Sequence, residues 1–267
     1  MTREEYEKKK FEDAVERNVG QKKLNYQGCE MEIIEYIDHQ HVKVRFNDEY
    51  KYTVIKQPSA FKSGRITNNF CPTLYGVGMI GNTETSINNN KKESYLCWKG
   101  MMARCYDTNS KETHYKAYSE CFVCDEWKIF ENFEKWYNKN YYEIPNCFRM
   151  CLDKDILHKG NKIYSPENCR FVPYDINIVF TKNNARRGDM PIGVYKNERR
   201  IDYQYYALCR YYTKQLTLGR FNSATEAFYC YKKFKEKYIK ELADKYKKYL
   251  PQEIYDAMYN YEVEITD

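Results

Sequence analysis

The sequence lacks any apolar run long enough to cross a membrane, and its first residues lack the pattern of a secretory signal. We therefore expect a soluble chain that works in the cytoplasm without a membrane partner. A large excess of one charge is also missing, because 44 basic and 38 acidic residues leave a net charge of +6. This balance permits a nucleic-acid partner without requiring one.

Cysteine occurs eleven times, an odd and scattered number that argues against a disulfide framework. The spacings of Cys121 with Cys124 and of Cys147 with Cys151 raise the alternative of structural Zn²⁺. The second spacing is loose and Cys151 continues into a strand-like run, so we favour buried thiols. Aromatic residues are abundant at 17%, which supports several small cores in a chain of 267 residues.

Hydrophobic periodicity predicts an α+β chain of several domains. A charged N-terminal helix, residues 1–22, begins after the capping residue Thr2. Residues 23–82 alternate apolar and polar side chains in short runs, and we interpret them as a small SH3-like β-barrel. Its role is open between DNA contact and a structural or protein-binding function. The strand-like runs occupy residues 31–36, 42–46 and 52–55, with a turn-and-strand piece at 61–66.

The remaining boundaries follow changes in composition. A polar, Asn-rich segment, residues 83–93, is typical of a linker. In residues 94–185, two helical stripes of aromatic residues indicate surfaces that face a core. Residues 186–250 give three strand candidates and a long helix that begins after the capping residue Ser223. An acidic tail, residues 251–267, is expected to form a short helix.

The strongest chemical pattern follows Leu152. Asp153 and Asp155 alternate along an apolar run, and residues two apart on a strand face the same side. Carboxylate oxygens are preferred ligands of Mg²⁺ and Mn²⁺. A Gly-Asn turn, a second strand-like run and a short helix-like segment come next, in the order hairpin, loop, helix. The alternative is that these carboxylates lie on a solvated hairpin and bind no metal, and the residues alone do not decide between the two.

Two motifs in this region are Leu152-Asp153-Lys154-Asp155 and Tyr164-Ser165-Pro166-Glu167-Asn168-Cys169-Arg170-Phe171-Val172. With the helical stripes before them, they resemble the HNH-type, or ββα-metal, endonuclease module of phage and mobile-element proteins. The resemblance implies a Mg²⁺ or Mn²⁺ site made by Asp153, Asp155 and Asn177. It also implies that Asn168 ties the loop of the catalytic hairpin.

The chain departs from this family at the general base. The position that holds a His in HNH modules falls at or near Asp155. An ordinary carboxylate has a pKa near 4 and is a weak base at neutral pH. His158, in the following loop, is a substitute base. The catalytic candidates are therefore Asp155, His158 and Asn168, with Asn177 as a metal ligand or, from its position alone, a helix cap.

A basic segment with interleaved tyrosines runs through residues 191–238, as three strand candidates followed by a helix. It resembles the DNA-binding domain of plant ethylene-response factors, the APETALA type, which often follows an HNH module in phage homing endonucleases. The resemblance implies double-stranded DNA as a partner, and a solvated basic face is the alternative. The expected DNA contacts are Arg186, Arg187, Lys196, Arg199, Arg200, Tyr205, Lys214 and Arg220.

These patterns lead to two hypotheses. The first is a phage-type DNA endonuclease or nickase that hydrolyses phosphodiesters with a divalent metal. The second is a non-catalytic DNA- or protein-binding factor on a degenerate HNH scaffold, which would regulate or inhibit a host defence nuclease and have a host or phage protein as its partner. The paired carboxylates favour the first hypothesis, and the missing His favours the second.

Overall fold

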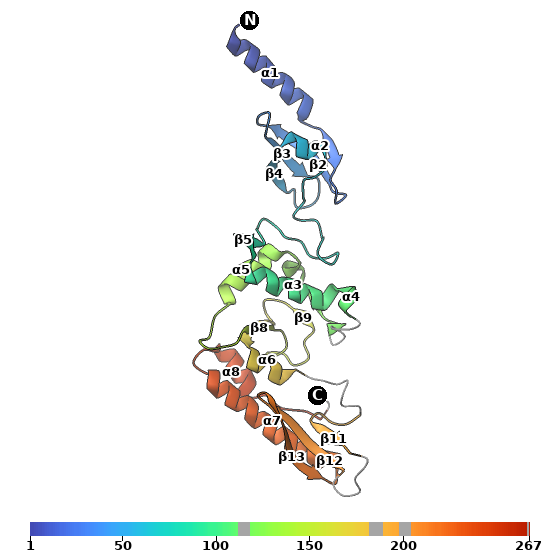
Figure 1. Ribbon diagram of the computed structural model, residues 1–267, viewed down its shortest axis with the longest axis vertical. Helices are drawn as coiled ribbons and strands as arrows, with labels where there is room; N and C mark the ends of the chain where they lie inside the picture. Colours follow the sequence, from blue (N-terminus) through green and yellow to red (C-terminus); the bar gives the residue numbers. More distant parts are fainter. Residues whose placement is uncertain (112–117, 182–188, 198–203, 266) are drawn as a thin grey trace. The chain divides into compact units, whose positions relative to one another are not determined.

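The computed structural model describes residues 1–111, 118–181, 189–197, 204–265 and 267 (Figure 1). The chain forms two compact units, Met1–Asn138 and Lys139–Asp267. Both mix helices with small sheets, which confirms the predicted α+β class. Among the described residues, no helix combines the length and the apolar character that a membrane span needs.

The first unit begins with α1, Arg3–Asn18, and Thr2 caps this helix as predicted. The Thr2 hydroxyl accepts a hydrogen bond from the backbone N–H of Glu5, and the Glu5 carboxylate accepts one from the N–H of Thr2. This reciprocal pair satisfies N–H groups that a helix end leaves without intrahelical partners. Ala14 alone is buried in α1, so the helix is peripheral.

A four-stranded antiparallel sheet follows α1, in the order β1-β2-β3-β4. The three predicted strands are present, and an edge strand precedes them. Alternate residues of β2 and β3 are buried against one another, as the period of two requires. A closed SH3-like barrel stays a prediction. The strands are β1, Lys22–Leu24, β2, Glu30–Tyr36, β3, Val42–Phe46, and β4, Thr53–Lys56.

The turn-and-strand prediction for residues 61–66 is wrong in part. Phe61 lies in a short helix, α2, Pro58–Lys62, which Pro58 starts with its fixed φ. Ile66 follows in an irregular segment, and both Phe61 and Ile66 are buried in the core of the sheet. Phe61 and Ile66 are apolar because both are buried, and this produced a strand-like pattern where no strand forms.

The segment predicted as a linker, residues 83–93, contains a hairpin. Strand β5, Ser86–Ile87, pairs with β6, Asn90–Lys91. Asn88 and Asn89 between them have φ values of 48° and 65°, which a two-residue hairpin turn requires. The hairpin ends are anchored, because Thr83 and Lys92 both contact the carboxylate of Glu134 at 2.6 and 2.9 Å.

The predicted aromatic stripes lie on α3, Glu93–Tyr106, and α5, Phe130–Asn140. Their large side chains are buried, and the Trp98 indole N–H donates a hydrogen bond to the Trp127 carbonyl at 2.7 Å. The stripes therefore form a core, as expected. The described residues between these helices form α4, Thr108–Lys111, β7, Phe122–Val123, and the 3-10 helix η2, Asp125–Lys128.

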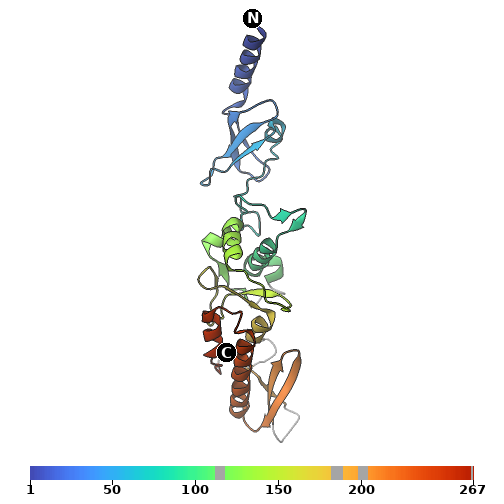
Figure 2. The same ribbon diagram turned by 90° about the vertical axis from the view of Figure 1, so that its left-hand side faces the viewer.

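The second unit is organised around α7, Ala224–Tyr246. The first half of α7 packs on a three-stranded antiparallel sheet in the order β11-β12-β13, and these strands overlap the predicted strand segments (Figure 2). Its second half packs on two further helices. The elements are β11, Val194–Lys196, β12, Tyr205–Tyr211, β13, Lys214–Phe221, α6, Tyr174–Phe180, and α8, Gln252–Tyr259.

Local contacts fix the ends of α7 and its distance from the sheet. The Ser223 hydroxyl accepts a hydrogen bond from the N–H of Glu226, as predicted for the cap. The helix ends at Tyr246, and Pro251 caps the start of α8. A Cβ placed on Gly193 would lie 2.1 Å from an atom of the Tyr231 ring, so this position admits no side chain.

Candidate metal centre and nucleic-acid interface

The two predicted metal-binding carboxylates lie at the end of a hairpin. Strand β8, Met150–Asp153, pairs antiparallel with β10, Arg170–Pro173, and Asp153 stands opposite Arg170. A short strand, β9, Ile163–Tyr164, lies in the connection. Because β8 ends at Asp153, Asp155 is not on the strand, and the predicted alternation along a strand is wrong.

A turn, and not a strand, sets the position of Asp155. The Asp153 Oδ1 atom accepts hydrogen bonds from the backbone N–H of Asp155 at 3.0 Å and of Ile156 at 2.8 Å. Asp side chains commonly fold the chain in this way. The charge of Asp155 acts on Asp153 across this turn. The two carboxylates are therefore close enough for the charge of Asp155 to oppose the ionisation of Asp153.

Asp153 is 6% exposed, and its environment changes its acidity. Burial first, and the nearby charge of Asp155 second, raise its pKa from 3.8 to about 6, while the two backbone hydrogen bonds and the charge of Lys154 oppose the rise. A carboxylate with this pKa accepts a proton near neutral pH better than an ordinary Asp does. Asp153 is thus a candidate general base.

Lys154 supplies a built-in cation. Its side chain is 8% exposed, and its Nζ atom lies 3.1 Å from Asp155 Oδ2. The same ammonium donates a hydrogen bond to the carbonyl of Asn161 at 2.7 Å and lies 5.9 Å from the centre of the Tyr164 ring. An ammonium therefore pairs with Asp155 at the place where the family resemblance implies a divalent metal.

Asn168 makes a hydrogen bond within the loop between β8 and β10. Its side-chain amide donates to the Asn161 side-chain oxygen at 3.4 Å. The amide of Asn161 in turn donates to the carbonyls of Lys154 at 2.7 Å and Ile163 at 2.8 Å. Gly160, with a φ of 80°, completes the predicted Gly-Asn turn. These contacts support a structural role for Asn168, and its catalytic role stays a prediction.

For Asn177 and His158, the structure shows no network of side-chain hydrogen bonds like that of Asn168 and Asn161 in the described residues. Asn177 lies inside α6, where its carbonyl accepts a hydrogen bond from the Thr181 hydroxyl at 3.2 Å. Pro173 occupies the N-cap, so Asn177 is not a helix cap. Helix α6 contacts β8 and β10, the arrangement that the resemblance implies. His158 is exposed in the loop, and its carbonyl accepts a hydrogen bond from the N–H of Asn161.

The cysteine pairs have no metal-binding arrangement in the part of the chain that the structure describes, where no three His, Cys, Asp or Glu side chains are grouped for a metal. All eleven cysteines are thiols. The Cys147 thiol donates to the carbonyl of Arg149 at 3.2 Å. The set of Asp153, Asp155 and Asn177, two carboxylates and one amide, stays a prediction.

The three-stranded sheet has one face against α7 and one face away from it. Val194, Ala207 and Cys209 are buried against the helix. Alternate residues of a strand point to opposite faces, so the residues between them point away. In the register of the sheet, Tyr206 of β12 lies opposite Tyr195 of β11 and opposite Arg220 of β13. We call this surface the outer face, and it comprises Tyr195, Tyr206, Leu208, Arg210, Gln215, Thr217 and Arg220.

The charge of these strands is of one sign. The three strands contain no Asp or Glu, whereas four of their residues are Lys or Arg. On the outer face, the guanidinium of Arg220 lies 5.6 Å from the centre of the Tyr206 ring. The ring of Tyr195, which is 55% exposed, meets Tyr206 edge-on at 6.4 Å. Cationic and aromatic groups that suit nucleic acid therefore lie together.

Arg220 is the one predicted DNA contact that the described residues place on the outer face. Tyr205 is half-buried and packs against the core beside α7, and Lys196 pairs with it on the same side, so the DNA contacts of both stay predictions. Lys214 is exposed at the start of β13. The other predicted contacts, Arg186, Arg187, Arg199 and Arg200, lie outside the described residues.

Tyr195, Tyr206 and Arg210 belong to the outer face but not to the predicted contacts. The alternation of a strand could have placed them there, because residues next to the buried, apolar Val194 and Ala207 point to the opposite face. Tyrosine weakens this signal, because its ring suits a core and its hydroxyl suits solvent.

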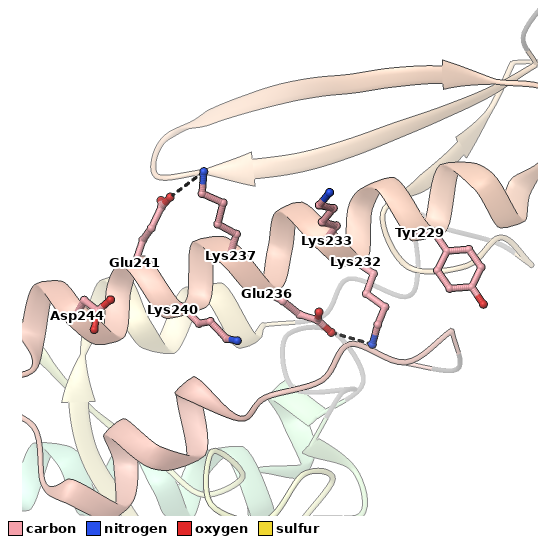
Figure 3. A pocket seen from close by; sticks show the side chains of 8 residues that line it. All are labelled: Tyr229, Lys232, Lys233, Glu236, Lys237, Lys240, Glu241 and Asp244. Atoms are coloured by element: carbon pink, nitrogen blue, oxygen red, sulfur yellow. Dashed lines mark ion pairs between the residues drawn. The ribbon is translucent and has the colours of Figure 1, made fainter.

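A shallow depression of about 670 Å³ lies on α7 (Figure 3). Lys232 pairs with Glu236 at 2.8 Å, and Lys237 pairs with Glu241 at 3.8 Å. One helix face with charges paired along it is typical of a solvated surface and not of an enclosed ligand site. The lining residues all belong to α7: Tyr229, Lys232, Lys233, Glu236, Lys237, Lys240, Glu241 and Asp244.

No protein-family model, curated protein or solved structure matches this chain. The two family resemblances therefore rest on the sequence motifs alone.

Proposed function

We propose that this protein binds double-stranded DNA through the outer face of its three-stranded sheet. The observation that carries the proposal is the charge of the strands, which hold Lys and Arg but no carboxylate, together with the Arg220–Tyr206 contact. Arg side chains contact phosphates and guanine edges, and Tyr hydroxyls contact phosphates. A surface without carboxylates avoids repulsion from the DNA backbone.

The dimensions of the sheet support this proposal. Neighbouring strands lie about 4.8 Å apart, so three strands span about 10 Å between the outer backbones. The major groove of B-DNA is about 12 Å wide and admits a two-stranded β-ribbon, and the backbones of these three strands together are narrower than the groove. Because α7 covers the opposite face, only the outer face is available for a groove.

Fluorescence anisotropy of the full chain with a labelled duplex tests the proposal. Arg210→Ala and Arg220→Ala should each weaken binding and reduce the slope of log K against log salt by about 1. Lys237→Ala is a matched control, because it removes one exposed cation from α7 and not from the outer face. Equal effects of all three variants would show that net charge, and not the outer face, binds DNA.

Metal-assisted phosphodiester hydrolysis is the second candidate function, and the coupling of Asp153 and Asp155 favours it. Asp155 and Asn177 would hold Mg²⁺ or Mn²⁺, which would stabilise the charge that develops on the cleaved phosphate. Asp153, with a pKa raised to about 6, would accept the proton of the attacking water. Lys154 would have to leave Asp155 for the metal to bind.

Plasmid nicking separates hydrolysis from binding alone. Cleavage of supercoiled DNA in Mg²⁺ or Mn²⁺ that Asp155→Ala and Asn177→Ala both lose would establish the nuclease. Intact DNA binding without cleavage would favour a DNA-binding factor on a degenerate scaffold, in which the Lys154 ammonium takes the place of the metal beside Asp155. The lysine alone would then neutralise that carboxylate.

A further inference from the structure

Phe148 is exposed to an extent that its chemistry does not favour. Its side chain has 80% of its surface accessible, more than any other aromatic residue in the described part of the chain. It precedes β8 and lies two residues after Asn146, whose φ is 60°. Scattered apolar side chains are common on surfaces, but an aromatic ring this exposed offers most of its surface to a partner.

The ring is held in place although it is exposed. The Arg149 guanidinium lies 5.7 Å from the centre of the Phe148 ring and 4.6 Å from that of Tyr174. The Phe148 and Tyr174 rings meet nearly edge-on at 5.7 Å and 69°. The Arg149 carbonyl is fixed by the N–H of Tyr174 and by the Cys147 thiol, at 3.0 and 3.2 Å. We call Phe148, Arg149 and Tyr174 the stacking cluster.

The stacking cluster is cationic. In the part of the chain that the structure describes, Arg149 has no carboxylate partner. The nearest carboxylate in sequence to Tyr174, Asp175, is already paired with Lys245 at 3.0 Å and accepts a hydrogen bond from Tyr246 at 2.8 Å. The cluster therefore offers an aromatic face and an uncompensated positive charge side by side.

We propose that Phe148 stacks on a nucleobase at a base step that opens partly in the bound DNA, and that Arg149 contacts an adjoining phosphate. The proposal rests on the proposed DNA-binding function and adds a second contact to it. Nucleobases have an aromatic face beside an anionic backbone, which is the complement of this cluster. A protein partner would require a larger contiguous apolar patch, whereas the neighbours of Phe148 on the chain, Cys147 and Arg149, include no second large apolar side chain.

The position of the cluster relates it to the hairpin carboxylates. Phe148 precedes Asp153 by five residues, which span at most about 18 Å of chain. Base pairs repeat every 3.4 Å or so along a duplex, so this length corresponds to about five base pairs. A base held by Phe148 would therefore lie within about one half-turn of a phosphate at Asp153.

Equilibrium binding of the full chain to a labelled duplex tests this inference. Phe148→Ala should weaken binding roughly 5- to 100-fold with an unchanged salt slope, because it removes stacking but no charge. Phe148→Trp should restore binding. Arg149→Ala should weaken binding and also reduce the salt slope. Tyr229→Ala, which removes another exposed ring, 62% accessible on α7, should leave affinity unchanged.

A duplex with 2-aminopurine at successive positions reports the stacking directly. Wild type and Phe148→Trp should change its fluorescence at one or two positions, and Phe148→Ala should not. Wild-type affinity of Phe148→Ala, with Arg220→Ala still impaired, would overturn this inference and leave the proposed function standing. Absence of DNA binding by the wild type would overturn both. Loss of self-association in Phe148→Ala, with unchanged DNA affinity, would instead assign Phe148 to a protein contact.

Discussion

Replacing Asp153 with Asn should stabilise the second unit above pH 6 and change little below pH 4. Asp153 is buried, and burial, then the charge of Asp155, raises its pKa to about 6. The folded state therefore holds this proton more tightly than the unfolded state does. Stability from the group is fully present below pH 3.8 and is lost as the pH rises to about 6. Asn has no proton to lose, and its side-chain oxygen can still accept the two backbone hydrogen bonds.

The size of the effect follows from the pKa shift. A rise from 3.8 to about 6 is about two units, and each unit is worth about 1.36 kcal/mol, so the ionised Asp153 costs about 3 kcal/mol at pH 8. Asp153 is only 6% exposed, so solvent screens little of this cost. The Asp153→Asn variant should therefore gain up to about 3 kcal/mol in the free energy of unfolding at pH 8.

Urea unfolding in a chelator, at about pH 4 and pH 8, measures this difference. All three tryptophans, Trp98, Trp127 and Trp136, lie in the first unit, so tryptophan fluorescence serves as an internal control. Far-UV circular dichroism includes α7 and follows the second unit as well. Equal or lower stability of the variant at pH 8 would refute the assignment of Asp153 as a buried carboxylate with a raised pKa.

Other substitutions test separate contacts. Asp155→Asn should lower the pKa of Asp153, because the Asp155 charge is the second cause of its rise, and carboxyl carbon NMR titration measures this pKa. Gly193→Ala should cost about 2–4 kcal/mol in urea unfolding, since its φ is 75° and its Cβ would meet an α7 ring at 2.1 Å. Gly160→Ala, with a φ of 80° and no atom within 4 Å, should cost only about 1 kcal/mol. Ser223→Ala should cost about 1 kcal/mol through loss of the α7 cap, measured in the same way.

An unchanged Asp153 pKa in Asp155→Asn would show that the two carboxylates are not coupled. Equal costs at Gly193 and Gly160 would show that α7 does not pack closely on the start of β11. A cost near zero for Ser223→Ala would show that the hydroxyl does not contribute to the start of α7.

Elements with a repeated local signal were predictable from the sequence. Alternation placed β2 and β3, and the capping residues Thr2 and Ser223 marked the starts of α1 and α7. These signals depend on residues close in the chain, which contact one another whatever the rest of the fold does. The three strands and the helix of the second unit follow from the same kind of pattern.

Residues whose position depends on distant contacts were harder to predict. The Asp153 side chain ends β8 by binding the N–H groups that follow it, and this moves Asp155 off the strand. Lys154 is charged but buried, because Asp155 and the carbonyl of Asn161 satisfy its ammonium. The alternation of apolar and polar residues predicts neither the turn at Asp153 nor the burial of Lys154.

Faces of the tyrosine-rich sheet were also ambiguous. Tyr205 and Tyr206 are adjacent and chemically identical, yet Tyr205 packs beside α7 and Tyr206 contacts Arg220 on the outer face. The polar appearance of residues 83–93 was misleading in another way. Its two asparagines adopt the left-handed conformation that a tight hairpin needs, so the segment is ordered by its turn and by Glu134.

The most direct test of the central claim is the salt dependence of duplex binding by wild type, Arg220→Ala and Lys237→Ala. If the outer face binds DNA, wild type and Lys237→Ala should bind with the same slope of log K against log salt. Arg220→Ala should then bind more weakly and lose about one unit of that slope. Identical binding curves for Arg220→Ala and wild type would contradict the claim that the outer face of the β11-β12-β13 sheet is the DNA-binding surface.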